Sequence, residues 1–255
     1  MPFEKVQSER VSDAVVRQIE LLILRGILRA GERLPSEREL SERLGVSRPS
    51  LREAVSALQE AGLLVSRANA GIFVAEVLGS AFSPGLMRLF SAHDEAVFDY
   101  LDFRSDLEGL AAERAARLGS DTDLAVVNEA FQRMAAQSDK RSPQDEAAQD
   151  AAFHLAIIEA SHNVVMLHMM RSMYELLQSG VFYSRKIMFQ QKTRQSALLD
   201  QHRAINAALQ NRDPAAARKA VEDHIGFVRA ALEDHRKSEK NEAIARQRLS
   251  FEQER

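Results

Sequence analysis

Two helix starts separated by a single glycine turn constrain the fold of this 255-residue chain more than any other feature. In S-E-R-E-L-S-E-R-L-G-V-S-R-P-S-L-R-E-A, Ser36 is a residue type that caps helices, and Glu39 completes the pattern of a capping box. Gly45 is typical of the position just beyond a helix C-terminus, and Ser47 with Pro49 indicates a second start almost at once. Two short helices joined by so tight a turn predict a helix-turn-helix.

The flanking segments extend this prediction to a winged helix over residues 1–76. Apolar spacing predicts a preceding helix over residues 11–28, and the second helix of the pair is expected to end at Gly62. After it, L-L-V-S-R and I-F-V-A are short β-prone runs on either side of A-N-A-G, which predicts a hairpin. We therefore expect a mainly α N-terminal domain with a small β-hairpin wing.

Several polar residues of this domain are placed to bind DNA. The N-terminal part of a recognition helix faces base edges, and here it carries Arg48, Ser50 and Arg52. Arginine suits bidentate contact with guanine. Arg38 in the preceding helix and Arg67 on the wing are placed to hold phosphates. The alternative is that these arginines only solvate helix surfaces among acidic neighbours, but the two caps, the tight turn and the wing together favour DNA.

Composition limits the remaining functions. The chain has 45% hydrophobic and 28% charged residues and a net charge of −3, so any nucleic-acid function depends on local placement of charge. It has no cysteine, which excludes disulfides, cysteine nucleophiles and thiolate metal sites and favours a cytoplasmic protein. We find no signal-peptide pattern at the N-terminus and no apolar run long enough to span a membrane, so no membrane association is expected.

The rest of the chain reads as helical. Residues 77–93 contain Gly, Ser and Pro and predict an interdomain connection, whereas residues 237–255 predict a polar tail. Between them, residues 94–236 predict an all-α antiparallel bundle because short loops join long helices. The expected helices cover residues 95–118, 122–137, 144–161, 164–186, 192–211 and 214–236.

Four side chains of this bundle predict a divalent metal site. Asp150 and His154 lie one helical turn apart on an apolar face. His202 and His224 lie on apolar faces of two helices joined near Asn211, at about the same distance from that turn, so they can converge. Zinc is the default expectation, and nickel or manganese also fit. The alternative is that these are ordinary core histidines and an i,i+4 pair.

At this point the sequence resembles a known family. L-P-S-E-R-E-L, V-S-R-P-S-L-R-E-A and L-x-x-x-G-L-L resemble the N-terminal signature of GntR-family bacterial transcription regulators. The resemblance implies DNA contacts from Arg38, Arg48, Ser50 and Arg52 and from the wing tip, where Asn69 lies. The tip departs from the glycine run of close relatives, because it reads Ala-Asn-Ala-Gly over residues 68–71.

The second half is similar to the FCD effector domain of the FadR subgroup. The resemblance rests on R-S-D-L-E-G-L-A-A-E-R-A-A, D-A-A-F-H-L-A-I with E-A-S-H-N, Q-H-R-A-I and D-H-I. Many members carry an Asp-x-x-x-His and two later histidines that bind a divalent metal. The matching positions here are Asp150, His154, His202 and His224.

A carboxylate effector is expected beside the metal. Arg104 falls on an apolar helix face, where a guanidinium needs a counter-charge, either from Glu108 one turn on or from a bound carboxylate. In the family, the arginine of R-x-x-x-E is implied in effector binding, so we favour the carboxylate. A 2-hydroxy or 2-oxo acid such as lactate, glycolate or pyruvate suits an arginine beside a metal. Tyr183, Arg185 and Asn206 are further candidates for the pocket.

These observations predict a DNA-binding transcriptional regulator, with repression as the expected sign. Its partners would be a near-palindromic operator, a small carboxylate and a second copy of the chain, the dimer being implied by the family. The alternative is a metal-dependent enzyme with a DNA-binding appendage. Such an enzyme needs a general base, and the one nearby candidate, Glu108, would be neutralised by Arg104. We therefore expect no catalytic residues.

Overall fold

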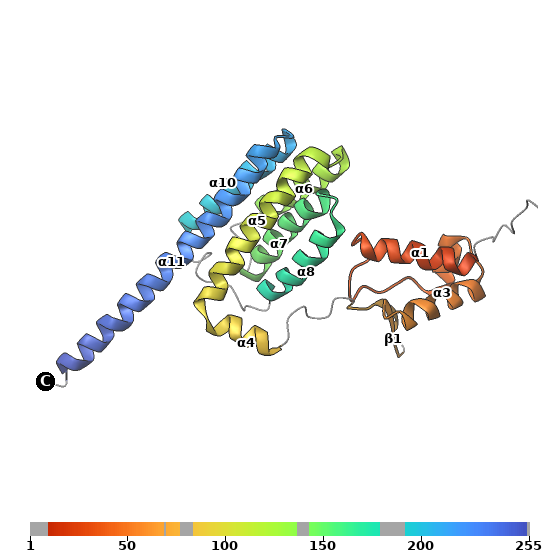
Figure 1. The fold of residues 1–255 in the computed structure, drawn as a ribbon, viewed down its shortest axis with the longest axis horizontal. Coiled ribbons are helices and arrows are strands. Elements are labelled where there is room, and N and C mark those ends of the chain that lie inside the picture. The colour runs from red at the N-terminus through yellow and green to blue at the C-terminus, as the bar shows by residue number, and fades with distance from the viewer. Residues whose placement is uncertain (1–9, 69, 77–83, 137–142, 179–191, 254–255) are drawn as a thin grey trace, which may run out of the picture. The chain divides into compact units, whose positions relative to one another are not determined.

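The computed structural model describes residues 10–68, 70–76, 84–136, 143–178 and 192–253 of the chain. The chain divides into two compact units, residues 1–81 and residues 82–255. Figure 1 shows the elements of both units, and each unit is described here by itself.

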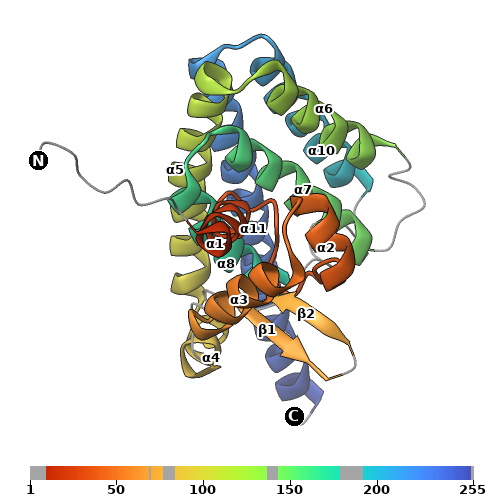
Figure 2. The ribbon, with the colours of Figure 1, turned by 90° about the vertical axis from the view of Figure 1, so that its right-hand side faces the viewer.

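Over residues 10–68 and 70–76, the N-terminal unit combines three helices with a two-stranded antiparallel sheet (Figure 2). The strands pair from Leu64 with Val74 to Arg67 with Gly71. This is the predicted order of a winged helix-turn-helix, and that prediction is confirmed. The elements are α1 (Val11–Leu24), α2 (Glu37–Leu44), α3 (Arg48–Glu60), β1 (Leu64–Arg67) and β2 (Gly71–Val74).

The caps that define the helix-turn-helix follow the sequence closely. The Ser36 hydroxyl accepts a hydrogen bond from the backbone N–H of Glu39 at 3.3 Å, and Gly45 ends α2 with φ of +64°. The predicted capping box is only half formed, because the Glu39 carboxylate accepts from Arg43 at 2.6 Å. Helix α1 stops at Leu24 instead of residue 28, because the chain turns at Gly26 with φ of +70°.

One apolar core fixes the recognition helix against the rest of this unit. Leu51, Ala54 and Leu58 of α3 are fully buried. They pack with α1 and with the first and last residues of the hairpin, Leu64 and Val74. Because α3 is amphipathic, burying this face leaves its arginines on the solvent side.

The second unit is a bundle of helices (Figure 1). Helix α11 lies along α5 and also packs on α10, while α7 packs between α5 and α6. This confirms the predicted all-helical second domain. The elements are α4 (Pro84–Ala92), α5 (Asp94–Leu118), α6 (Asp121–Ala135), α7 (Pro143–Ala160), α8 (Val164–Gln178), α10 (Lys192–Gln210) and α11 (Pro214–Gln253).

Two predicted non-helical segments turn out to be helical in part. Within the connection expected over residues 77–93, residues 84–92 form α4, whose Phe90 packs against the bundle core. Proline is tolerated in the first turn of a helix, so Pro84 does not prevent it. The tail expected over residues 237–255 continues α11 to Gln253. It contains no glycine or proline, and the pair of Glu242 and Arg246 supports it.

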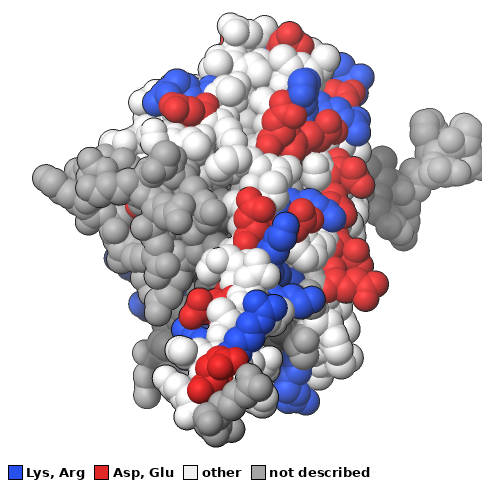
Figure 3. Space-filling model, turned by 90° about the vertical axis from the view of Figure 1, so that its left-hand side faces the viewer, with Lys and Arg blue, Asp and Glu red and all other residues white. Residues whose placement is uncertain are grey.

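The outer face of α11 carries several ion pairs, each between two residues one helical turn apart. Acidic and basic side chains alternate along this face in Figure 3. The pairs are Arg218–Glu222, Lys219–Asp223, Arg229–Glu233 and Arg246–Glu242. Such pairs between residues one turn apart give modest support to a solvent-facing helix, and salt screens them. In the described part of the chain, no helix has the length and apolarity needed to cross a membrane.

At one end of the bundle, the first turn of α6 is bound to the α7–α8 turn. Ser120 caps α6 in a full capping box with Asp123, in which the Asp123 backbone N–H donates to the Ser120 hydroxyl at 3.1 Å. His162, in the α7–α8 turn with φ of +53°, contacts the Asp123 carboxylate at 2.9 Å. This contact therefore ties the ends of three helices together.

Candidate metal centre and nucleic-acid interface

Four side chains from three helices of the bundle converge on one point. They are Asp150 and His154 of α7, His202 of α10 and His224 of α11. Each offers one ligand atom, and these atoms lie within 4.8 Å of one another. Nε2 of His202 is 3.1 Å from Oδ1 of Asp150 and 3.4 Å from Nε2 of His154. The structure thus brings together all four residues that the sequence proposes as metal ligands.

The α10–α11 hairpin explains why residues so far apart in sequence meet. Asp213 caps α11, accepting a hydrogen bond from its first turn at 3.0 Å, and the chain reverses there. The rings of His202 and His224 then lie 4.3 Å apart between centroids. Phe153, fully buried, meets the rings of His154 and His202 edge-on at 5.7 and 5.4 Å. This packing limits the rotation of both imidazoles.

The protonation states of these groups suit metal binding. Burial, and then the neighbouring imidazoles of His202 and His154, hold the pKa of His224 well below its ordinary value, so its ring is neutral. Burial raises the pKa of Asp150. The hydrogen bond from His202 and the electrostatic effect of the neighbouring imidazoles outweigh that effect, so the pKa lies far below its usual range and the carboxyl is ionised. A metal ion binds these two forms.

The net charge of the cluster favours a cation. Glu108, 2% exposed, lies beside the ligands: burial raises its pKa, but Arg104 and His154 outweigh this and lower the pKa to about 2. A metal ion binds imidazoles in their neutral form, and in that form the carboxylates of Glu108 and Asp150 exceed the single guanidinium of Arg104 by one negative charge. A buried excess charge is costly unless it is compensated. A divalent cation would supply that compensation.

One pair of ligand atoms already has the spacing expected around a metal ion. Zinc–nitrogen bonds of roughly 2.1 Å place two tetrahedral ligands about 3.4 Å apart. That is the distance between Nε2 of His154 and Nε2 of His202. Nδ1 of His224 contacts the side-chain carbonyl of Gln201 at 3.1 Å. Because that oxygen can only accept, Nδ1 carries the proton and Nε2 keeps its lone pair, as in metal sites with an outer carbonyl partner.

A buried polar network adjoins the centre on the α5 side. Arg104 Nε donates to Oε1 of Glu108 at 2.6 Å, and the Tyr174 hydroxyl donates to the same oxygen at 3.0 Å. Oε2 of Glu108 lies 2.7 Å from Nδ1 of His154. The approach is off the N–H direction, so this is a close polar contact and not an aligned hydrogen bond. Burial raises the pKa of Tyr174 well above its ordinary value, so the phenol is a neutral donor.

The predicted effector residues divide into three groups. Arg104 is buried and pairs with Glu108, the simpler of the two alternatives considered from the sequence. Asn206, also buried, lies one turn beyond His202 and donates to Asn128 of α6 at 2.9 Å. Tyr183 and Arg185 fall outside the described residues.

The predicted DNA-binding side chains lie on the solvent face of the winged helix. Arg38, Arg48, Arg52 and Arg67 are exposed, and Ser50 is half-buried; Asn69 lies outside the described residues. Arg38 pairs with Glu42 at 3.5 Å and Arg52 with Glu37 at 2.8 Å, both exposed pairs. Exposed pairs contribute only about 0.2–1 kcal/mol, so DNA phosphates can compete for these guanidiniums. Arg48 has no acidic partner within the described ranges.

The Ser50 and Arg67 side chains are held by their neighbours. Ser47 caps α3 by accepting from the backbone N–H of Ser50 at 3.3 Å, and the two hydroxyls lie 2.9 Å apart. The Arg67 guanidinium stacks 4.5 Å over the ring of Phe73 on the facing strand. These contacts pre-position both side chains on the surface that also carries the recognition helix.

Sequence reasoning missed two residues of the metal centre. Glu108 was considered as the partner of Arg104 and as a general base that Arg104 would neutralise, but not as a neighbour of His154, which its second oxygen faces. Gln201, which contacts His224, precedes His202 directly in the sequence. No sequence signal identifies the Glu108 contact, because it depends on how α5 packs against α7.

Comparison with known proteins relates both units to transcription regulators. The family described as bacterial regulatory proteins, gntR family, matches residues 11–74, and the FCD domain family matches residues 99–227. The Glc operon transcriptional activator of Escherichia coli (strain K12) is 34% identical over 233 residues, covering 90% of this chain and 92% of its own. A regulatory protein of the same organism, named for the L-lactate dehydrogenase operon, is 35% identical, covering 89% and 88%.

A more distant relative and a solved structure agree with these matches. The HTH-type transcriptional regulator LutR of Bacillus subtilis (strain 168) is 31% identical, covering 83% of this chain and 96% of its own. The solved structure of Streptococcus agalactiae GntR matches with a TM-score of 0.52 and 25% identity, covering 86% of this chain and all of that one.

Proposed function

The chain belongs to the GntR family of bacterial regulatory proteins and carries an FCD domain, and from that premise we propose a metal-dependent sensor of a small carboxylate. It is a transcriptional regulator, and its domains and relatives are those of regulators instead of enzymes. That removes the alternative of a metal-dependent enzyme. The winged helix binds DNA, and the FCD domain binds the small molecule.

The observation that carries the proposal is the cluster of one partly exposed aspartate and three buried histidines. Its ligands would be Asp150, His154, His202 and His224, with zinc the first choice and nickel or manganese compatible. Bound there, a divalent ion would act as a Lewis acid that holds an anionic oxygen. The protein's own residues orient these ligands. Gln201 contacts His224, and Phe153 packs on the imidazole rings of His154 and His202.

Charge indicates what kind of effector fits. With its imidazoles in the neutral form that a metal binds, the cluster carries one excess negative charge, so a divalent cation would leave one excess positive charge. One carboxylate would restore neutrality in a site that is otherwise costly to charge. A 2-hydroxy or 2-oxo acid adds a second oxygen for the metal. Two relatives are named for the Glc and L-lactate dehydrogenase operons, which supports glycolate, lactate or pyruvate as first candidates.

The regulatory mechanism would be a population shift in a homodimer. The effector would bind one arrangement of the helical domains better and so change the spacing of two winged helices on a near-palindromic operator. Apolar side chains left exposed on α5 and α8 support a partner copy; they are Phe103, Leu110, Leu118, Val165 and Met169. Repression relieved by the effector is the proposed sign, although one relative is by name an activator.

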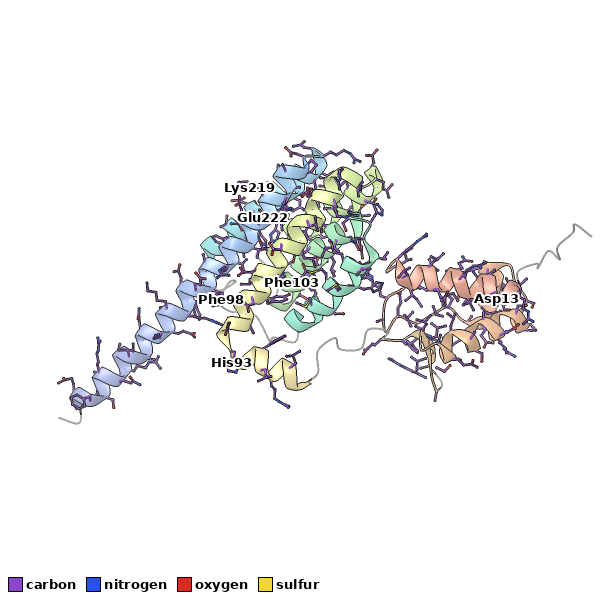
Figure 4. The ribbon with its side chains drawn as sticks, viewed as in Figure 1. Asp13, His93, Phe98, Phe103, Lys219 and Glu222 are labelled. Atoms are coloured by element: carbon purple, nitrogen blue, oxygen red, sulfur yellow. The ribbon has the colours of Figure 1, made fainter. Side chains whose placement is uncertain are left out.

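The sensor site is tested by thermal unfolding of purified protein. We expect glycolate, lactate, pyruvate or 2-hydroxyglutarate to raise the melting temperature, and a chelator to abolish the rise, because ligands of the native state stabilise it by mass action. His202→Ala should abolish both effects. His93→Ala is the matched control, because His93 is exposed at the α4–α5 junction (Figure 4). No acid effect in metal-loaded wild type would refute the sensor.

DNA recognition is tested by binding to duplexes selected from a random pool. The double variant Arg48→Ala, Arg52→Ala should lose specific affinity without unfolding, since both side chains are exposed. Loss of one guanine contact costs about 1–3 kcal/mol. The control is Arg246→Ala, an exposed arginine of α11. Normal operator affinity in the double variant would refute the assigned recognition helix.

A further inference from the structure

Glu108 bridges two sites that the proposed function treats separately. One of its oxygens accepts from Arg104 and Tyr174, and the other faces Nδ1 of His154 at 2.7 Å. The bridge joins α5, α7 and α8, and each of its four side chains is at least nine-tenths buried. Within a low-dielectric interior, charges this close affect one another strongly.

The contact of Glu108 with His154 bears on which ring nitrogen of this proposed metal ligand carries the proton. A carboxylate beside Nδ1 favours the tautomer with a proton there, which leaves the Nε2 lone pair toward Asp150 and His202. A carboxylate that accepts from the outer nitrogen orients a metal-bound imidazole and raises its basicity, and the close polar contact of Glu108 places a carboxylate at that nitrogen. The more negative charge Glu108 presents to His154, the stronger a ligand that imidazole becomes.

The ion pair of Glu108 with Arg104 determines how readily this guanidinium can bind another anion. Arg104 lies between two aromatic rings, with its central carbon 5.9 Å from the Tyr100 centroid and 5.3 Å from the Tyr174 centroid. Within the described residues, Glu108 is the acidic side chain that neutralises it. A carboxylate ligand at Arg104 must therefore compete with Glu108 for the same guanidinium.

We propose that Glu108 is a positioning residue that couples anion binding at Arg104 to metal binding at His154. This inference rests on the proposed function and adds to it the route of communication. An anion that takes over Arg104 releases part of the negative charge of Glu108 to His154, so the metal binds more tightly. By thermodynamic reciprocity, the metal then strengthens anion binding by the same factor.

The alternative is a purely structural bridge that holds α5 against α7. The two roles differ in what removal of the charge does to each ligand alone. With a neutral side chain at 108, Arg104 is left uncompensated and should bind an anion better in metal-free protein. His154 at the same time loses its anionic partner and should bind metal less well. A structural defect would weaken both.

The experiment compares wild type with Glu108→Gln, which keeps size and loses charge. Co²⁺ is titrated by its visible absorption, with and without glycolate and lactate, and binding of the same acids to chelator-treated protein is measured by calorimetry. We expect Glu108→Gln to bind Co²⁺ about 10–100-fold more weakly. It should bind the acid more tightly without metal, and the acid should no longer change its affinity for Co²⁺.

The matched control is Glu113→Gln, on the same helix but paired with Arg218 on the surface. It should behave as wild type. If Glu108→Gln does not fold, Tyr174→Phe removes one donor to Glu108 and should reduce the coupling factor while leaving Co²⁺ bound.

The outcomes separate the two levels of inference. If wild type binds Co²⁺ and an acid with positive coupling, and Glu108→Gln retains that coupling, the bridge is wrong and the sensor stands. If Glu108→Gln weakens Co²⁺ and acid alike, the residue is structural and the coupling role is refuted. If wild type binds neither Co²⁺ nor any acid, the sensor itself fails and the coupling role with it.

Discussion

Replacing Gly45 by alanine tests the turn on which the helix-turn-helix depends. Gly45 ends α2 in the left-handed region, with φ of +64°, and a Cβ added there would meet no atom within 4 Å. The cost is therefore backbone strain alone, about 1–2 kcal/mol for a residue with a Cβ. Alanine also restricts the unfolded chain, which offsets about 0.4–1 kcal/mol. We expect Gly45→Ala to destabilise the N-terminal unit by about 1 kcal/mol.

The measurement is native-state hydrogen exchange of α2 and α3 amides, which reports the stability of this unit separately from the bundle. Gly45→Asn should cost less than alanine, because asparagine tolerates the left-handed conformation. Gly226→Ala is the matched control: Gly226 lies inside α11, where alanine meets open space and should stabilise by about 0.5–1 kcal/mol. A neutral Gly45→Ala, or an asparagine more damaging than alanine, would refute the strain argument.

Two further predictions follow from the partly exposed carboxylates of Asp123 and Glu37. Burial raises the pKa of Asp123, but hydrogen bonds with Ser120 and His162 outweigh this and lower it below 3.8, so its stabilisation is present above that pH and is lost as pH falls further. Asp123→Asn should therefore flatten thermal stability against pH below about 4, in a pH series of melting curves. Glu37→Gln should free Arg52 and strengthen operator binding up to about fivefold in a binding titration, whereas weaker binding would mean that Glu37 orients Arg52 for DNA.

The sequence determined the winged helix and the α-helical second half. Helix caps, glycine turns and apolar periodicity are local signals, so Ser36, Gly45 and Ser47 placed the helix-turn-helix to within a residue. The same signals placed Asp150 and His154 on one helix face. The spacing around Asn211 placed His202 and His224 at about the same distance from the turn that joins their helices. Periodicity fixes which side chains share a face, whatever the face packs against.

The sequence did not predict two of the helical segments, because neither has a clear periodic apolar face. Residues 237–253 are helical because they contain good helix formers and ion pairs, but they bury nothing, so their composition resembles that of a polar tail. Residues 84–92 contain a proline and a glycine that suggest a connection, yet contact of Phe90 with the bundle makes them a helix. Both segments are decided by context beyond the sequence pattern.

Only the tertiary structure decided how Glu108 is used. From the sequence, its position one turn after Arg104 predicts an i,i+4 pair, and the same pairing argues against a role as general base. Packing of α5 against α7 and α8 turns its second oxygen to His154 and brings in Tyr174, from 66 residues away along the chain. Helical periodicity specifies the direction in which a side chain points, but not which residues of other helices pack against it. The role of a buried carboxylate depends on those neighbours.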